Sequence, residues 1–284
     1  MNNLEKNITF VIVSYLSSHI IEKSIKGINS NIRIIVVENS GNKNVKSYLE
    51  KKFCNVEVII SHKNLGFGGG NNLGVSKVKT QYAFILNPDT ILGKNCLKVF
   101  YKALTILKND FVILAPNLLN NYGYFSNQSH NLKKNLLEVE YVKGFAMLIN
   151  LKKINNKKIF DENFFLFLEE IDFCKRVKND GGKIFVVKNS KIQHLGKQSS
   201  ENILNVELCK NWHWMWSLFY YNYKHFGFLI AYIAVIRKFF SSLFKLFFFL
   251  IFFNKKKFLI HYYRLNGLLN AFLQRPSWLR PNNI

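Results

Sequence analysis

The sequence predicts an α/β fold in which a mostly parallel sheet is flanked by helices and followed by a helical extension. Three observations support this prediction. Strand-like and helix-like stretches alternate along the first half of the chain, which is typical of parallel sheets with helical crossovers. Polar residues directly follow several of the strand-like stretches. After about residue 205 the composition changes to aromatic and basic runs, so we expect domains over 1–205 and 206–284, the second membrane-associating.

The first strands are expected where short runs of β-branched and apolar residues indicate burial on both faces. In parallel sheets, ligands bind beyond the carboxyl ends of the strands. Glu38 ends the second such run and Asn64 follows the third, so both should lie at that edge. The expected strands are 8–14, 32–37, 56–61 and 81–86, with helices at 17–28 and 45–53.

A glycine-rich stretch, Asn64 to Asn72, follows the third expected strand and has four glycines in five positions. Such a stretch allows a ligand to approach the backbone closely. If a helix begins near Asn71 or Asn72, its free N–H groups form an anion site. The spacing matches neither the dinucleotide fingerprint nor the P-loop. The alternative is a plain flexible loop.

A lone carboxylate, Asp89, follows the fourth expected strand, which Pro88 ends. An exposed carboxylate at a sheet edge suits Mg²⁺ or Mn²⁺, with phosphate oxygens and water as the other ligands. The alternative is an ordinary turn Asp. His194 follows the last expected strand, where it could meet Asp89. The remaining expected elements are a helix at 96–108, strands at 111–116, 141–149 (with Gly144 at a close approach) and 183–187, and a loop over 117–134.

An acidic stretch follows five large apolar residues between Phe164 and Arg176. If a helix begins near Glu169, then Glu169, Asp172 and Arg176 share one face while Glu170 points elsewhere. A carboxylate held among apolar side chains at a helix start is a plausible general base. The alternative is an acidic helix start that serves only as a cap.

The charge of the chain suggests a polyanionic partner. The net charge is +23, and the stretch from Val206 to the end has eleven Lys and Arg against one acidic residue, Glu207. Nucleic acid, a phosphorylated substrate or an anionic membrane would each fit. Four scattered cysteines form no metal-binding spacing and fit a reducing compartment, and we expect no signal peptide.

The last part of the chain is predicted to form helices that lie in a membrane interface. An aromatic belt at 211–223 precedes two apolar runs, 228–236 and 239–253, which Arg237 and Lys238 separate. Neither run reaches the ~20 residues of a spanning helix, and three lysines follow at 255–257. A spanning hairpin and a soluble helical bundle remain alternatives. The long Phe and Leu runs fit lipid better than nucleic acid.

Taken in order, these stretches resemble the family 2 inverting glycosyltransferases, which have the GT-A fold (Rossmann-like), and most closely their bacterial rhamnosyltransferase-like branch. The resemblance extends from about Ile8 to Lys197 without a break. The matching stretches are 11–15, 36–40, 64–72, 86–90, 143–147, 164–176 and 194–196.

The resemblance implies transfer of a sugar from a nucleotide diphosphate sugar with inversion at the anomeric carbon. It implies that Glu38 contacts the nucleoside, and that Asn64 and Gly66 help to hold the nucleotide. Asp89 matches the metal-binding carboxylate, although the first acid of the family's DxD-like element is Asn87 here. His194 matches a ligand of the metal or diphosphate.

The same resemblance makes Glu170 the catalytic base, where the family usually has Asp. Glu169 and Asp172 match acceptor-binding or supporting groups. The implied cofactor is Mg²⁺ or Mn²⁺. The implied acceptor is a lipid-linked glycan of polysaccharide or lipopolysaccharide biosynthesis, with dTDP-rhamnose a possible donor.

We therefore expect a peripheral or monotopic enzyme at the cytoplasmic face of the inner membrane, with no nucleic-acid partner. The alternative is a non-catalytic nucleotide- or polyanion-binding protein on a degenerate GT-A scaffold. The replacement of Asp by Glu at Glu38 and Glu170 leaves room for that alternative.

Overall fold

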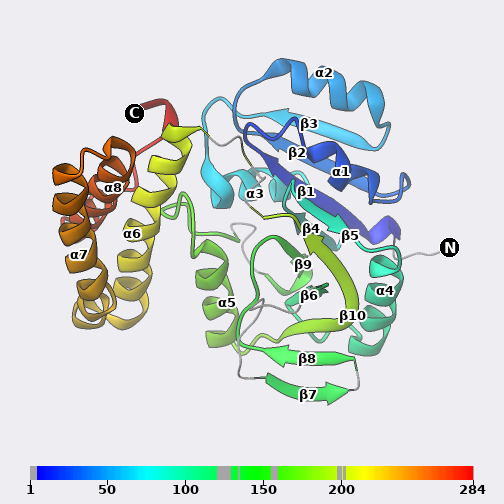
Figure 1. Ribbon diagram of the computed structural model, residues 1–284. Coiled ribbons are helices and arrows are strands. Elements are labelled where there is room, and N and C mark those ends of the chain that lie inside the picture. The colour runs from blue at the N-terminus through cyan, green and yellow to red at the C-terminus, as the bar shows by residue number, and fades with distance from the viewer. Residues whose placement is uncertain are drawn as a thin grey trace. The chain divides into compact units, whose positions relative to one another are not determined.

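The computed structural model describes residues 5–119, 129–133, 135–154, 159–196, 200 and 203–283. The chain forms two compact units (Figure 1). The first, called here the sheet unit, comprises Met1–Phe160 and Glu170–Ser200. The second, the helical unit, comprises Asp161–Glu169 and Glu201–Ile284. The domain division expected from the sequence, at residue 205, did not assign the short segment Asp161–Glu169 to the helical unit.

The sheet unit is built on one ten-stranded sheet with the order β3-β2-β1-β4-β9-β6-β10-β8-β7, in which β5 also pairs with β10. The strands are β1 (Ile8–Ser14), β2 (Arg33–Glu38), β3 (Val56–Ile60), β4 (Tyr82–Leu86), β5 (Thr90–Leu92), β6 (Ile113–Leu118), β7 (Ser129–Lys133), β8 (Leu136–Val139), β9 (Ala146–Asn150) and β10 (Ile184–His194).

Strands β1 to β4 are parallel, as expected. The rest of the sheet is mixed, because β9 runs antiparallel between β4 and β6. Strand β10 is parallel to β6 and therefore runs in the same direction as β4. Three short strands, β5, β7 and β8, were not predicted. The loop expected over 117–134 contains β7, and its residues 120–128 and 134 lie outside the described part of the chain.

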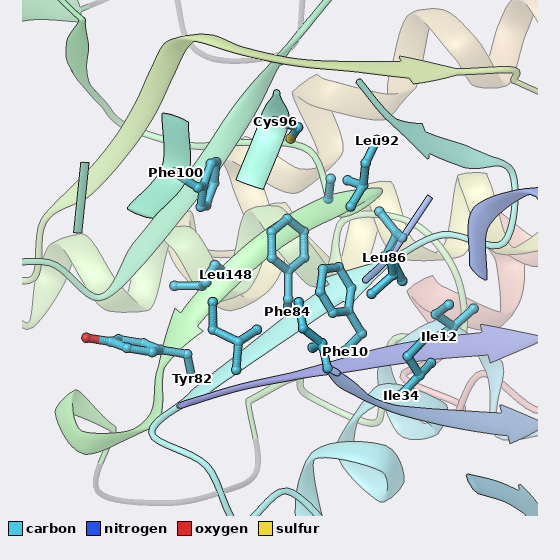
Figure 2. Close-up of a cluster of buried hydrophobic side chains, with 14 of the residues drawn as sticks. Phe10, Ile12, Ile34, Tyr82, Phe84, Leu86, Leu92, Cys96, Phe100 and Leu148 are labelled. Atoms are coloured by element: carbon cyan, nitrogen blue, oxygen red, sulfur yellow. The ribbon is translucent and has the colours of Figure 1, made fainter. Parts of the chain in front are cut away.

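Helices cover both faces of this sheet. One face packs against α1 (Ile21–Lys26), α2 (Lys43–Lys52) and α4 (Cys96–Leu107) through a core in which the rings of Phe10 and Phe84 stack at 4.6 Å (Figure 2). The other face packs against α3 (Gly66–Ser76) and α5 (Glu169–Asn179) through a second core.

The glycine-rich stretch is helical, contrary to the expectation of a loop followed by a helix near Asn71. Helix α3 begins at Gly66 and lies very close to the sheet. A Cβ atom on Gly74 would lie 2.4 Å from Cγ1 of Val11, and one on Gly70 would lie 2.8 Å from Cγ1 of Val13. These two glycines therefore serve helix–sheet packing, because any side chain there would push α3 away from β1.

The helical unit contains three long helices, α6 (Leu204–Phe226), α7 (Phe228–Ile251) and α8 (Lys255–Phe272), which pack on one another. Its core includes Trp212, Met215, Trp216 and Phe219, all nearly inaccessible to solvent. Their spacing places them on one face of α6. Much of the stretch expected to be an aromatic belt in a membrane interface is therefore the core of this unit.

The two apolar runs belong almost entirely to the single helix α7, and Arg237 and Lys238 lie within it. Among the described residues, no helix combines the length and apolar character needed to cross a bilayer. The buried side of α7 is made of small residues, including Ala231, Val235 and Ser242, while many of its phenylalanines are exposed.

Candidate active site

The predicted site residues of the sheet unit come together at one edge, because β1, β2, β4 and β10 run in the same direction. Ser14 and Glu38 end β1 and β2 and are register partners. His194 ends β10 and is the register partner of Thr90, the residue after Asp89. The antiparallel pairing of β5 with β10 brings Asp89 next to His194, which confirms the expectation that the two residues could meet.

Glu38 is buried and turns back on its own chain. Its Oε1 accepts a hydrogen bond of 2.7 Å from the backbone N–H of Ser40 and another from the Ser40 hydroxyl. This holds the turn after β2 in a fixed shape. The other carboxylate oxygen, Oε2, could make the contact with the nucleoside that was predicted from the sequence.

Asn39 was not singled out from the sequence, although it lies inside one of the matching stretches. Its backbone N–H donates to the Ser14 carbonyl at 2.8 Å, and its Nδ2 donates to the Gly66 carbonyl at 2.9 Å. It therefore joins the ends of β1 and β2 to the start of α3. Within the described chain, the buried Asn39 Oδ1 and Ser14 Oγ have no hydrogen-bond partner, so both are available to a ligand or to water.

Asn64 and Gly66, predicted to help hold a nucleotide, shape the start of α3. Asn64 Oδ1 accepts a hydrogen bond of 3.0 Å from the Gly66 N–H, and Gly66 has a φ of 72°. A side chain would be strained in this left-handed conformation, so glycine suits the position. The structure shows the hydrogen bond between Asn64 and Gly66, whereas their contact with a nucleotide stays a prediction.

Asp89, expected to be exposed at the sheet edge, is instead completely buried, and His194 Nε2 lies 3.2 Å from its Oδ1. No described residue donates a hydrogen bond to either oxygen of this carboxylate. The His194 ring stacks on Phe145 with centroids 4.3 Å apart. The backbone N–H of Asn87 also donates to the Phe145 carbonyl at 2.9 Å, which ties the Asp89 turn to the same residue.

These residues fit a divalent cation. A buried carboxylate without hydrogen-bond donors, beside an imidazole, offers one oxygen and one nitrogen ligand. The residues that the structure describes contain no group of three or more His, Cys, Asp or Glu side chains that could hold a metal. Asp89 and His194 would thus supply part of a coordination shell, and Mg²⁺ or Mn²⁺ commonly takes the remainder from phosphate and water.

Glu170, the predicted base, lies in the second position of α5 and is mostly shielded from solvent. Its Oε1 is 3.9 Å from Nζ of Lys143. A Cβ atom on Gly144 would lie 3.2 Å from Cβ of Glu170 and 3.2 Å from the Phe67 ring. The close approach expected at Gly144 is therefore an approach to Glu170 on α5 and to Phe67 on α3.

Asp172 and Glu169 have different surroundings. Asp172 is fully buried, and its Oδ2 accepts a hydrogen bond of 2.9 Å from Nε of Arg176 on the same face of α5. This ion pair supports the fold next to Glu170. Glu169 is buried and is the last residue of the segment that belongs to the helical unit. Their predicted roles at an acceptor stay predictions.

The backbone just before these acids is unusual. Phe167 and Leu168 have φ angles of 70° and 67°, and neither is glycine. Each such residue costs roughly 1–3 kcal/mol and persists only where its surroundings hold it. Residues in such conformations cluster at functional sites.

Three residues on one short stretch of chain connect the parts of this site. Phe145 stacks on His194 beside Asp89, Gly144 faces Glu170, and Lys143 lies 3.9 Å from the Glu170 carboxylate. The stretch Lys143–Phe145 therefore contacts both the buried Asp89–His194 pair and the shielded Glu170 carboxylate. The pair offers ligands for a diphosphate-bound cation, and the carboxylate can accept a proton.

The chain is similar to known proteins in sequence and in fold. The family model for glycosyl transferase family 2 matches residues 9–173. The low-salt glycan biosynthesis hexosyltransferase Agl10 of Haloferax volcanii is 26% identical over 200 residues, which cover 61% of this chain and 62% of that protein. The chain thus spans less than two thirds of this relative. The rhamnosyltransferase WbbL of Escherichia coli K12 is 24% identical over 213 residues, 62% of this chain and 79% of that protein.

Solved structures share the fold. TarS 1–349 of S. aureus aligns with a TM-score of 0.55 at 14% identity, over 95% of this chain and 92% of that one. The mannosyltransferase PcManGT from Pyrobaculum calidifontis, in complex with GDP-Man and Mn²⁺, aligns with a TM-score of 0.55 at 9% identity, over 94% and 87%. These likenesses show the GT-A fold. Because its family model matches more than half of its residues, the chain belongs to glycosyl transferase family 2.

Proposed function

We propose that the chain is an inverting glycosyltransferase that moves a sugar from a nucleotide diphosphate sugar to an acceptor hydroxyl. One observation carries the proposal: the short stretch Lys143–Phe145 contacts both His194 of the Asp89–His194 pair and Glu170. Inverting transfer needs a proton acceptor and a site for the departing diphosphate on opposite sides of the reacting sugar. The family assignment and the nucleotide-sugar complexes of the structural neighbours support the same reading.

In this mechanism Glu170 accepts the proton of the acceptor hydroxyl as its oxygen attacks C1 of the sugar. The new C1–O bond forms as the bond from C1 to the diphosphate oxygen breaks, so a single displacement inverts the anomeric carbon. Asp89 and His194 would hold the divalent cation. When bound, that cation offsets the negative charge that develops on the departing diphosphate. The edge formed by Glu38 and Asn39 would bind the nucleoside.

The named relatives guide the choice of donor and acceptor. One is a hexosyltransferase of glycan biosynthesis and the other a rhamnosyltransferase. We therefore propose a hexose or deoxyhexose donor, with dTDP-rhamnose the first to test. The proposed acceptor is a lipid-linked glycan of surface polysaccharide or lipopolysaccharide biosynthesis.

We also propose that the helical unit binds the surface of an anionic membrane, at the cytoplasmic face of the inner membrane. Large apolar side chains of α7 are exposed, among them Phe244 at 71%, Ile251 at 70% and, just beyond the helix, Phe253 at 93%. Large apolar side chains that are exposed together on a protein surface usually mark an interaction site. Residues 228–272 contain no Asp or Glu, and their cations include Lys255–Lys257, which would attract anionic lipid headgroups.

The transfer proposal is tested with a panel of nucleotide sugars. The donor that protects the chain best against thermal unfolding is identified first. Release of nucleoside diphosphate from that donor is then measured for the wild type and for Glu170→Gln. The variant should bind the donor normally and lose on the order of 100-fold or more of its turnover.

Two outcomes would contradict the proposal. Donor binding without any turnover in the wild type, with every tested acceptor, would favour a non-catalytic nucleotide-binding protein. Normal turnover by Glu170→Gln, combined with an inactive Asp172→Asn that folds normally, would move the base to Asp172.

A further inference from the structure

We propose that the helical unit positions the catalytic base: it holds the segment Asp161–Glu169, and Ser217 on α6 acts on Glu170 through that segment. The inference rests on the assignment of Glu170 as the base under the proposed function. Its structural basis is that Asp161–Glu169 belongs to the helical unit although it lies within the catalytic part of the sequence. One peptide bond links its last residue, Glu169, to Glu170.

The start of the segment is held by charge and hydrogen bonds from α6. Oδ2 of Asp161 accepts a hydrogen bond of 2.8 Å from Lys224 and one of 3.1 Å from the Tyr220 hydroxyl. Burial alone would raise the pKa of Asp161, but the hydrogen bonds from Lys224, the Asn163 N–H and Tyr220 outweigh it and lower that pKa. The carboxylate is thus an anchor that stays charged at neutral pH.

The backbone of the segment is held at two carbonyl groups. Ser217 Oγ donates to the Leu166 carbonyl at 2.7 Å, and Ser277 Oγ donates to the Asn163 carbonyl at 2.5 Å. Ser217 is completely buried. The Leu166 carbonyl is four residues before Glu170 and just before the two residues with left-handed backbone. These bonds fix main-chain atoms, so they restrain the path of the chain toward Glu170.

The aromatic side chains of the segment pack into the same unit. The Phe164 ring lies edge-on to Tyr220 at 4.9 Å, and the Phe167 ring lies edge-on to Trp214 at 5.6 Å. The Phe165 ring contacts His213 at 4.6 Å and has the Arg280 guanidinium 3.9 Å from its centroid. Side chains along the segment are therefore embedded in the helical unit.

Phe167 and Leu168 have a left-handed backbone, so the packing of the segment Asp161–Glu169 in the helical unit matters for catalysis. A free segment would leave these conformations, because side chains disfavour them. Relaxation there would move the chain that leads directly into Glu170. A general base must lie within hydrogen-bond reach of the proton it accepts, so small displacements reduce the rate of transfer. The helical unit thus contributes to catalysis in addition to any role at a membrane.

The test compares two buried serines of the helical unit in the full-length chain. Ser217→Ala removes the bond to the Leu166 carbonyl, whereas Ser242→Ala is the matched control because Ser242 is a buried serine on α7. Nucleoside diphosphate release is measured as hydrolysis of the donor, in which water takes the place of the acceptor hydroxyl, so neither the lipid-linked acceptor nor membrane binding enters. Ser217→Ala should lower kcat roughly 5- to 10-fold, the effect of about one hydrogen bond, with unchanged donor Kd. Ser242→Ala should keep the wild-type kcat.

A double-mutant cycle separates positioning from a general loss of structure. If Ser217 acts through Glu170, then Ser217→Ala should not further reduce the residual rate of Glu170→Gln. The inference would be overturned if Ser217→Ala reduced kcat by the same factor in the wild type and in Glu170→Gln. It would also be overturned if Ser242→Ala reduced kcat as much as Ser217→Ala does. If Ser217→Ala has a normal kcat while Glu170→Gln is inactive, this inference is overturned and the assignment of Glu170 as the base stands. Normal turnover by Glu170→Gln would overturn the base assignment, and this inference with it.

Discussion

His194 Nε2 lies 3.2 Å from Oδ1 of Asp89, and no described residue donates a hydrogen bond to either oxygen of that fully buried carboxylate. A buried carboxylate without donors is unfavourable unless a cation or another group compensates its charge. We therefore interpret the pair as a site that is completed by the cation and diphosphate of a donor.

The first prediction concerns this pair. Mn²⁺ together with the nucleoside diphosphate of the preferred donor should stabilise the wild type, by about 2.7 kcal/mol at one hundred times Kd. Asp89→Asn should abolish most of this stabilisation, because it removes the anionic ligand. Without ligand, Asp89→Asn should be no less stable than the wild type, because asparagine keeps the shape of the side chain and no hydrogen bond to the carboxylate oxygens is lost. Thermal unfolding with and without EDTA measures both effects. An equal ligand-induced shift in Asp89→Asn, or full activity in EDTA, would contradict the assignment.

The second prediction concerns the gap between Gly144 and Glu170. Gly144→Ala would place a methyl group 3.2 Å from Cβ of Glu170 and from the Phe67 ring. Overpacking of this kind costs about 1–3 kcal/mol of stability, and here it should also displace Glu170 and lower kcat about tenfold. Gly27→Ala is the control, because its new methyl group would make only an ordinary contact, 3.4 Å from the Ser24 carbonyl. Wild-type kcat in Gly144→Ala would show that Glu170 tolerates displacement or is not the base.

Much of the site could be predicted from the sequence because its parts are local patterns at strand ends. The meeting of Asp89 with His194 was expected because each lies near the end of a strand, but it also depends on β5, which was not predicted and which pairs with β10. The strand β9 was expected within 141–149, but its antiparallel direction could not be predicted, because a buried strand has the same pattern in either direction. The start of α3 was misplaced because glycine usually indicates a loop, whereas Gly70 and Gly74 are required here by close packing on β1.

The assignment of Asp161–Glu169 to the helical unit could not be predicted either. It depends on contacts between residues far apart in the sequence, such as that between Ser217 and Leu166. A run of apolar residues before an acidic helix indicates burial but not the surface against which it is buried. For the same reason, Trp212 and Trp216 were expected at a membrane interface and are instead core residues of α6.

The third prediction concerns the exposed apolar side of α7. The double variant Phe244→Ser and Ile251→Ser should reduce binding to anionic vesicles by tenfold or more, because inserting such a side chain contributes roughly 1.5–3 kcal/mol. Ile106→Ser is the control, since Ile106 is an exposed apolar residue of the sheet unit. Co-sedimentation with vesicles measures binding. High salt should release only part of the wild type, since salt screens charge attraction and not apolar insertion. Complete release by salt would contradict an inserted helix.

The fourth prediction concerns His213, which is fully buried in the helical unit with Nε2 2.8 Å from the Leu279 carbonyl. Burial lowers the pKa of His213 to about 3; the bond to Leu279 opposes this, and nearby Arg280 adds to it. In the unfolded chain the imidazole titrates near its ordinary pKa of about 6.5. Above that pH both states are neutral, and the contribution of the buried neutral ring is fully present. As the pH falls, only the unfolded state takes up a proton, so stability is lost progressively from about pH 6.5 toward pH 3.

At pH 5 this loss from His213 should reach about 2 kcal/mol relative to pH 7.5. His261, whose pKa burial lowers to about 4, acts in the same direction, so the total pH dependence of the wild type should be larger. His213→Gln should remove the part due to His213, because glutamine does not titrate, while its amide can still donate to the Leu279 carbonyl. Urea unfolding at pH 7.5 and pH 5, followed by tryptophan fluorescence of α6, measures the difference. His62→Gln, which replaces an exposed histidine of the sheet unit, is the control for the substitution itself. Equal pH dependence in the wild type and His213→Gln would show that His213 accepts a proton while the helical unit remains folded.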